Sequence, residues 1–245
     1  MSTYEKILTW WQSHRIRCPG DLDKLLQDFN PTFAYHSCLL EDRQLTQSMV
    51  TEFFRTGTVS QFSGDPMELV QLYSQKRCYE YLRERVLARD DLDTPLVLEI
   101  HRVLNSGTYA EPYYLFQGER PGELKKQDFV TAVNAVGASA RDVGQELDEL
   151  MEEVCGYCGS DLLQAAAYFH CRFENIHPFA AGNGATGRVL VTYFLLTPDH
   201  PPLIVFNEDR EEYLRCLTVY DREKDCRPLA ELFEKELAKT WPMEA

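Results

Sequence analysis

The sequence has no apolar run that approaches the roughly 20 residues needed by a membrane-spanning helix. Its first residues, MSTYEKILTWWQSHRIR, also lack the basic start, apolar middle and small-residue cleavage site of an export signal. These absences predict a cytoplasmic protein without a membrane partner. No internal repeat or low-complexity tract is visible, which predicts a single domain over residues 1–245.

Basic residues are scarce, because 25 Lys and Arg stand against 39 Asp and Glu and give a net charge of −14. A nucleic-acid partner is therefore not expected, since phosphate contacts need clustered basic side chains. A small anionic ligand would need a focused positive site within this negative field.

Paired cysteines are also scarce. The chain has eight cysteines, but only Cys155 and Cys158 are closely spaced. Without an export signal, reduced thiols are expected rather than disulfides. No two further ligands at suitable spacing would complete a zinc site. We therefore favour a helix end and a turn for this pair over a metal or redox site.

Helical periodicity dominates what is present. Asp65 and Pro66 are typical of an N-cap and a first helical position, and they precede a long amphipathic stretch. Residues 108–140 are rich in Gly, Pro and aromatics and predict a loop with a short β-hairpin. The expected fold is mainly α-helical, with N-terminal helices in about residues 1–60 and a core in about 61–245.

The segment HPFAAGNGATGR combines three features that suit phosphate chemistry. His177 ends one helix, because a proline follows it, and the next helix begins near Gly184. The free N–H groups of that helix, with those of Gly182 and Asn183, can converge on an anion. Arg188, one turn later, adds a positive charge.

His177 beside such an anion site, with a pKa near neutral, is a candidate general base. It would deprotonate a hydroxyl that attacks phosphorus, while backbone amides stabilise the developing charge. The alternative is a helix–turn–helix corner in which glycine and proline only punctuate the chain.

The same segment resembles the Fic (Fido) family signature, His-x-Phe-x-Asp/Glu-Gly-Asn-Gly-Arg-x-x-Arg. The resemblance extends over roughly residues 35–240 and implies a Fic-type helical bundle with a β-hairpin flap. The matching residues are His177, Phe179, Gly182, Asn183, Gly184 and Arg188.

By this resemblance the chain would transfer AMP from ATP to a Ser, Thr or Tyr hydroxyl of a target protein. His177 would be the base, Gly182 to Gly184 the anion hole, and Arg188 the γ-phosphate contact. Asn183 would hold the α-phosphate region. Phe179 and Gly187 complete the predicted nucleotide-binding set. Many members self-associate, so a homo-oligomer is also considered.

Two alanines depart from the signature. Ala181 stands where an Asp or Glu would bind magnesium, and Ala185 stands where the first arginine would contact phosphate. A methyl group offers no oxygen ligand and no charged donor, which makes a magnesium-dependent reaction doubtful. Three interpretations stay open: an impaired or inactive descendant that still binds a nucleotide or a partner, use of a different phosphate donor, or alanines introduced to disable the protein.

A second match lies upstream, in the segment AYHSCLLEDRQLT. Ser37 and Glu41 keep the Ser/Thr-x-x-x-Glu spacing of the family's inhibitory helix, although Asp42 and Arg43 replace the usual Gly and Asn. A spacing of four places the serine and the glutamate on one helical face. The resemblance implies that Glu41 pairs with Arg188 and takes the place of the γ-phosphate. The alternative is a solvated helix carboxylate.

Other chemically capable residues have ordinary explanations. His101 and His170 lie among apolar neighbours and are expected to be packed or hydrogen-bonded in the core. His36 adjoins the proposed inhibitory segment and is interpreted as local structure. Lys125 and Lys126 are expected at the rim of the flap, to which a target strand could add by backbone pairing.

Overall fold

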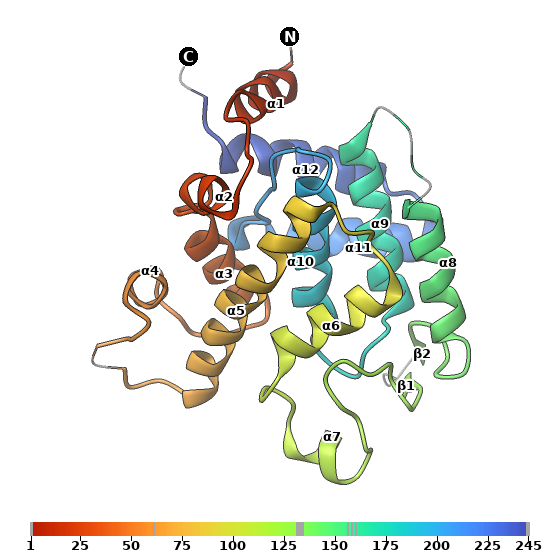
Figure 1. Ribbon diagram of the computed structural model, residues 1–245. Coiled ribbons are helices and arrows are strands. Elements are labelled where there is room, and N and C mark those ends of the chain that lie inside the picture. The colour runs from red at the N-terminus through yellow and green to blue at the C-terminus, as the bar shows by residue number, and fades with distance from the viewer. Residues whose placement is uncertain are drawn as a thin grey trace.

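The computed structural model describes residues 2–60, 62–130, 135–155, 157, 159 and 161–243. Within these ranges the chain is mainly helical, with a single pair of two-residue strands (Figure 1). The elements are α1 (Thr3–Ser13), α2 (Pro19–Leu25), α3 (Phe29–Leu40), α4 (Gln47–Thr56), α5 (Pro66–Ala88), α6 (Thr94–Asn105), α7 (Glu111–Leu115), β1 (Phe129–Val130), β2 (Ala135–Val136), α8 (Val143–Cys155), α9 (Leu162–Ile176), α10 (Asn183–Leu196), the 3₁₀ turn η1 (Asn207–Asp209), α11 (Arg210–Glu223) and α12 (Arg227–Thr240).

Local sequence sets the helix boundaries. The Asp65 side chain accepts a hydrogen bond from the Met67 amide at 2.9 Å, with Pro66 at the first helical position, which confirms the predicted cap of α5. Asp161 caps α9 in the same way, because it accepts from the Gln164 amide at 3.0 Å. Both helices therefore begin where a side chain satisfies a free backbone donor.

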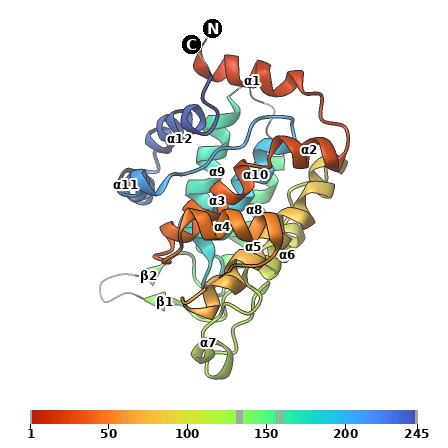
Figure 2. The same cartoon turned by 90° about the vertical axis from the view of Figure 1, so that its left-hand side faces the viewer.

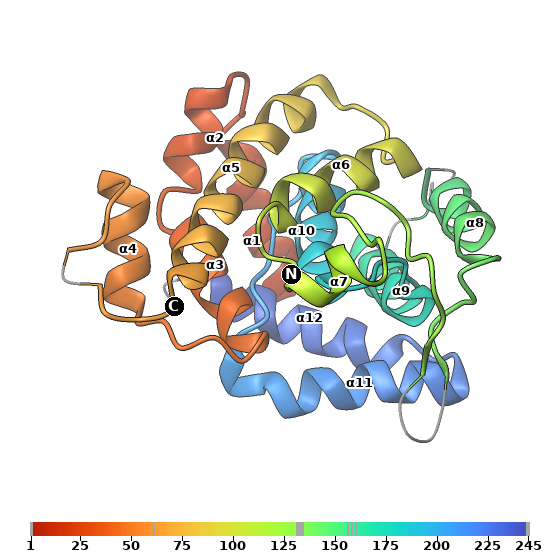
Figure 3. The same ribbon diagram turned by 90° about the horizontal axis from the view of Figure 1, so that it is seen from below.

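Helices α9 and α10 form the centre of the bundle. Helix α10 is apolar on most sides and is surrounded by α3, α5, α6 and α9 (Figure 3). Helix α9 packs against α8, α10, α11 and α12. Because the two central helices are joined by the segment from His177 to Gly182, the packed core fixes both ends of that segment.

The N-terminal helices belong to the same packed body as the rest of the chain. One hydrophobic cluster contains Ile7 and Trp11 of α1 together with Leu237 of α12. Helix α3 contacts α4, α5 and α10, so the predicted inhibitory segment lies directly against the central helix. The division at about residue 60 stays a prediction.

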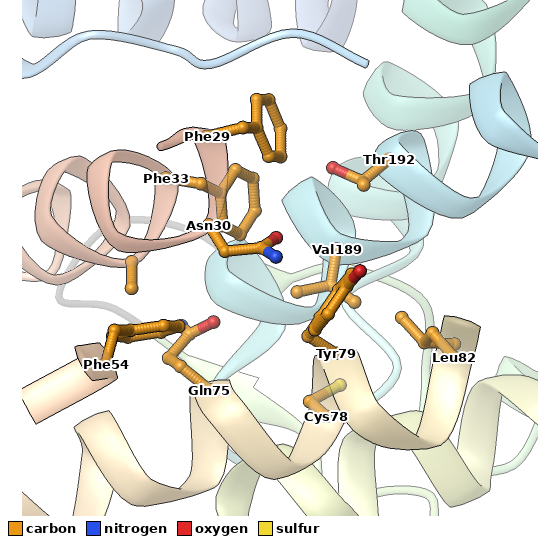
Figure 4. Close-up of a pocket in the computed structure, with 11 residues that line it drawn as sticks. Phe29, Asn30, Phe33, Phe54, Gln75, Cys78, Tyr79, Leu82, Val189 and Thr192 are labelled. Carbon is orange, nitrogen blue, oxygen red and sulfur yellow. The ribbon is translucent and has the colours of Figure 1, made fainter. Parts of the chain in front are cut away.

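A small cavity separates α3 from α5 and α10 (Figure 4). Its volume is about 30 Å³, and its lining includes Phe33, Gln75 and Val189. None of the predicted site residues lines it. This volume holds one or two water molecules and excludes a nucleotide.

The two short strands and α7 lie at the end of the bundle opposite α1 (Figures 1 and 2). Strands β1 and β2 pair antiparallel, with Phe129 opposite Val136. Residues 131–134 lie outside the described residues, so the hairpin flap as a unit stays a prediction. None of the described helices is long and apolar enough to cross a membrane.

Candidate active site

His177 caps the C-terminal end of α9. It adopts a left-handed conformation with φ 52°, and its amide donates to the Phe173 carbonyl at 3.0 Å. Burial, reinforced by the nearby Lys125 ammonium, lowers the pKa of His177 to about 4. This value is below the near-neutral range predicted from the sequence. The imidazole is consequently neutral at pH 7, which is the form that can accept a proton.

The segments that flank the two strands are hydrogen-bonded to the backbone on either side of His177. The Lys125 amide donates to the Pro178 carbonyl, and the Ala138 amide donates to the Ile176 carbonyl, each at 2.9 Å. A side-chain carbon on Gly137 would lie 2.5 Å from the Cβ of His177 and 3.0 Å from the Nζ of Lys125. These contacts bring a buried ammonium close to the imidazole. Lys125 is 2% exposed, so its predicted place at the rim was wrong, because the backbone contact to Pro178 draws it inward.

Two buried rings shape the loop after His177. The Phe179 ring stacks on the His101 imidazole, with centroids 3.6 Å apart and planes within 7°. The His101 Nδ1 accepts from the Gly122 amide at 2.8 Å, so its Nε2 carries the proton and donates to the Ala181 carbonyl at 3.0 Å. Burial lowers the pKa of His101 to about 4, and its predicted core role is confirmed.

Two residues that were predicted to bind the nucleotide have side chains that pack or form hydrogen bonds within this loop. Phe179 is 0% exposed. The Asn183 side chain accepts from the Phe179 amide at 2.9 Å and donates to the Phe179 carbonyl at 2.8 Å, which satisfies both ends of its amide group. Both side chains therefore have partners within the loop, and their direct contact with a nucleotide stays a prediction. The backbone amide of Asn183 stays a predicted part of the anion site.

Gly182 makes the turn into α10 possible. Its φ is +78°, and a side chain there would collide with the Asn105 carboxamide. The amides of Gly182, Asn183 and Gly184 have no backbone acceptor within the described part of the chain. They therefore form the free donor end of α10, as predicted.

A carboxylate already lies over this donor end. A side-chain carbon on Gly184 would lie 2.6 Å from the Oε1 of Glu41 and 3.1 Å from the Nη1 of Arg188. Arg188 Nη2 donates to that Oε1 at 2.8 Å, and the same guanidinium donates to the Ser37 hydroxyl at 3.2 Å and the Ser37 carbonyl at 3.1 Å. The predicted inhibitory pair and the motif arginine are thus in direct contact.

The exposures of the two charges are unequal. The Arg188 side chain is 5% exposed and that of Glu41 is 37% exposed. Burial opposes the charged guanidinium, but the Glu41 carboxylate overcomes it and raises the pKa of Arg188 above its ordinary value. Arg188 is therefore a buried permanent cation that needs an anionic partner.

Gly187 faces the interior. A side-chain carbon there would lie 2.9 Å from the Cε1 of His170 and 3.0 Å from the Oε1 of Glu174. The absence of a side chain at Gly187 provides the space for these two residues, and its contact with a nucleotide stays a prediction. His170 is 0% exposed and accepts or donates with the Tyr213 hydroxyl at 2.6 Å, which confirms its predicted core role.

The two alanines contribute no ligand side chains. The Ala181 carbonyl accepts from His101 and from the Tyr109 hydroxyl, at 3.0 and 3.2 Å, and Ala185 packs partly against the core. Among the described residues no group of three His, Cys, Asp or Glu side chains could hold a metal. These residues do not fit a magnesium site of the family type. Of the cysteine pair, Cys155 is exposed, while Cys158 lies outside the described residues.

Comparison with known proteins agrees with this geometry. A model of the Fic/DOC family matches residues 91–195, which include His177 and Arg188 but not Glu41. The chain contains a Fic/DOC domain. Protein adenylyltransferase Fic of Drosophila melanogaster is 37% identical over 214 residues, which cover 83% of this chain and 40% of that protein. The corresponding Drosophila persimilis protein is 38% identical over 76 residues, or 29% of this chain and 15% of that protein. The chain thus spans two-fifths or less of the length of these curated relatives.

Solved structures show the same Fic fold. A Fic-domain-containing signalling protein from Bacteroides thetaiotaomicron superposes with a TM-score of 0.82 at 21% identity, covering 98% of this chain and 94% of that chain. Fic-1 from C. elegans, residues 134–508, gives a TM-score of 0.76 at 20% identity, covering 96% and 70%. At these identities the likeness supports the fold alone.

Glu174 is the site residue that the sequence analysis missed. It lies one helical turn before His177 and reaches under α10 beside Gly187. Its i−3 spacing from the proposed base was the available signal, because residues three apart share a helical face.

Proposed function

We propose that this Fic domain transfers AMP from ATP to a Ser, Thr or Tyr hydroxyl of a target protein, and that Glu41 restrains the reaction. The proposal is supported by the neutral imidazole of His177, the free amides at the start of α10 and the buried cation Arg188. The names of the Drosophila relatives point to the same reaction class.

The reaction needs one proton acceptor and one anion site. His177 would take the proton of the target hydroxyl, whose oxygen forms a bond to the α-phosphorus of ATP. The bond from that phosphorus to the pyrophosphate oxygen breaks, and pyrophosphate leaves. The amides of Gly182 to Gly184 would stabilise the negative charge that develops on the phosphoryl oxygens. No step is assigned to a metal.

The position of Glu41 is the observation that carries the proposal. Its carboxylate lies close to Gly184 and accepts a hydrogen bond from Arg188, so an anion already lies beside the start of α10. A terminal phosphate would make the same contacts once Glu41 withdraws. Because two anions cannot share these donors without repulsion, Glu41 and a productively bound nucleotide would exclude one another.

The second candidate is a catalytically silent module that binds a nucleotide or a protein. Ala181 and Ala185 favour it, because both positions lack the charged groups of the family signature. Loss of one donor to a transition state costs about 100- to 1,000-fold in rate. Binding could persist through the amides and Arg188.

Labelled ATP separates the two candidates. The wild-type protein and a Glu41→Gly variant are incubated with α-labelled ATP and a cell lysate, with His177→Ala as the control. Label that appears on protein, increases in Glu41→Gly and disappears in His177→Ala supports transfer. ATP binding without any label supports a silent nucleotide-binding module, whereas no ATP binding by either protein contradicts both AMP transfer and a nucleotide-binding module.

Restoring the signature tests whether the two alanines limit the activity. An Ala181→Asp, Ala185→Arg double variant supplies a carboxylate and a guanidinium at the two altered positions. Activity that appears only in this variant would show that the remaining scaffold is competent. Because Glu41 would still restrain this variant, the same repair is also made together with Glu41→Gly. A repaired protein without Glu41 that binds ATP and stays inactive would count against His177 as a working base.

A further inference from the structure

Glu174 is a buried acid beside the anion site that the proposed reaction does not use. Its side chain is 15% exposed, and its Oε1 is buried without a hydrogen-bond partner within the described residues. The same oxygen lies against Gly187, directly before Arg188 in the first turns of α10. A buried carboxylate oxygen without a donor is costly when ionised.

The neighbours of Glu174 offer it little hydrogen bonding. On its own helix, the Nε2 of His170 is 3.9 Å from the Oε1 of Glu174 and already bonds to the Tyr213 hydroxyl of α11. Burial lowers the pKa of His170 to about 3, so this ring is uncharged. Burial likewise raises the pKa of Tyr213, which stays a neutral phenol. Neither group provides a positive charge for the carboxylate.

Three charged groups act on Glu174 from the surrounding helices. Arg188 of α10 favours its ionised form, whereas Glu41 at the end of α3 and Asp221 of α11 oppose it. Burial exceeds all of these and raises the pKa of Glu174 to about 7. The carboxyl group therefore changes its protonation in the pH range in which its neighbours keep their charges.

We propose that Glu174 is a positioning residue of the anion site, which gains a proton when an anion pairs with Arg188 and loses it when that anion leaves. In the ligand-free protein the anion is the Glu41 carboxylate. In the nucleotide complex it would be the terminal phosphate, so this inference rests on the proposed function. The proton comes from solvent and forms an O–H bond on the Glu174 carboxyl group.

The consequence is a buried counter-charge that adjusts to the occupant of Arg188. With no anion bound, ionised Glu174 compensates the guanidinium. With a polyphosphate bound, neutral Glu174 removes a repulsion that would otherwise weaken binding. Binding linked to proton uptake strengthens as the pH falls through the titration of the group.

Titration of the carboxyl carbon of Glu174 by ¹³C NMR, assigned through the backbone, tests the inference without a nucleotide. The wild-type protein is compared with Glu41→Gln, which keeps the shape of the side chain and removes its charge. We expect the Glu174 midpoint to fall in Glu41→Gln. An Asp221→Asn variant is the matched control, and the response to Glu41→Gln should persist in it. Equal midpoints in wild-type and Glu41→Gln proteins would overturn the inference.

The nucleotide arm uses ATP and the Glu41→Gln protein with and without Glu174→Gln. We assume that bound ATP raises the titration midpoint of Glu174 by about one pH unit. The affinity for ATP should then fall between pH 6 and pH 8 by a factor about five times larger in the protein with Glu174 than in the Glu174→Gln variant. Titration of ATP itself is the same in both proteins and cancels. Identical pH dependences of ATP affinity in the two proteins overturn the inference. Failure of ATP to bind either protein overturns the proposed function, and the ligand-free titration then decides the role of Glu174.

Discussion

Replacing Glu41 by Gln should strengthen ATP binding. The substitution removes the carboxylate that Arg188 Nη2 contacts at 2.8 Å and keeps the volume of the side chain. A hydrogen bond to a charged group contributes about 1.5–3 kcal/mol, and the 37% exposure of Glu41 reduces this to about 1–2 kcal/mol. Because the nucleotide binds only the fraction of molecules in which Glu41 has withdrawn, its affinity should rise about 5- to 30-fold.

The same change should weaken the fold. Arg188 is 5% exposed and would lose its anionic partner, which costs about 1–3 kcal/mol. For a domain of this size that loss lowers the Tm by about 2–4 °C per kcal/mol. Tighter ATP binding together with a lower Tm would show that the Glu41 carboxylate had blocked the site. A general stabilisation of the protein would raise the Tm.

Asp42→Asn is the matched control for this prediction. It makes the same charge change one residue later, but the Asp42 carboxylate is 75% exposed and pairs with Arg210 on the surface. Calorimetric titration with ATP should show no more than a small change in this variant. Unchanged affinity in Glu41→Gln, or an equal gain in Asp42→Asn, would refute the role of the Glu41 carboxylate as a competitor.

Three further predictions address the base, the turn and the cavity. Lys125→Met should raise the pKa of His177 from about 4 toward its ordinary value, and NMR titration of the imidazole that shows no rise would contradict the electrostatic contact. The folded-state pKa of His177 lies below its unfolded-state pKa, so its contribution to stability is complete above the unfolded-state pKa and decreases as the pH falls toward 4. In the variant, where the folded-state pKa is higher, this decrease should be complete at a higher pH. Gly182→Ala should lower the free energy of unfolding by about 1–3 kcal/mol. The loss should exceed that of Gly57→Ala, because Gly57 has a similar positive φ but open space around it. Equal losses in denaturant titration would exclude the collision with Asn105 of α6. Val189→Ile should fill part of the 30 Å³ cavity and raise the Tm by about 2 °C, whereas a lower Tm would indicate overpacking.

Much of the fold could be predicted from local chemistry. Pro178 cannot continue α9, and Asp65 with Pro66 begins α5, so the sequence places these boundaries correctly. The spacing of Ser37 and Glu41 likewise predicted a shared face, and both side chains contact Arg188. These features follow from residues near one another in the chain.

The sequence could not predict the directions in which the side chains of the motif point. A motif gives the order of Phe179, Asn183 and Gly187 but not which of them face the ligand. That is decided by distant partners, because the His101 ring covers Phe179 and the Glu174 carboxyl group lies against Gly187. Burial of Lys125 has the same kind of cause, since it depends on pairing with the Pro178 carbonyl.

A crystal structure of the Glu41→Gln protein with a non-hydrolysable ATP analogue tests the central claim most directly. We expect the phosphates at the amides of Gly182 to Gly184, with the terminal phosphate on Arg188 and the α-phosphate within reach of the His177 imidazole. A nucleotide bound elsewhere, with Arg188 still held by Ser37 alone, would contradict the account.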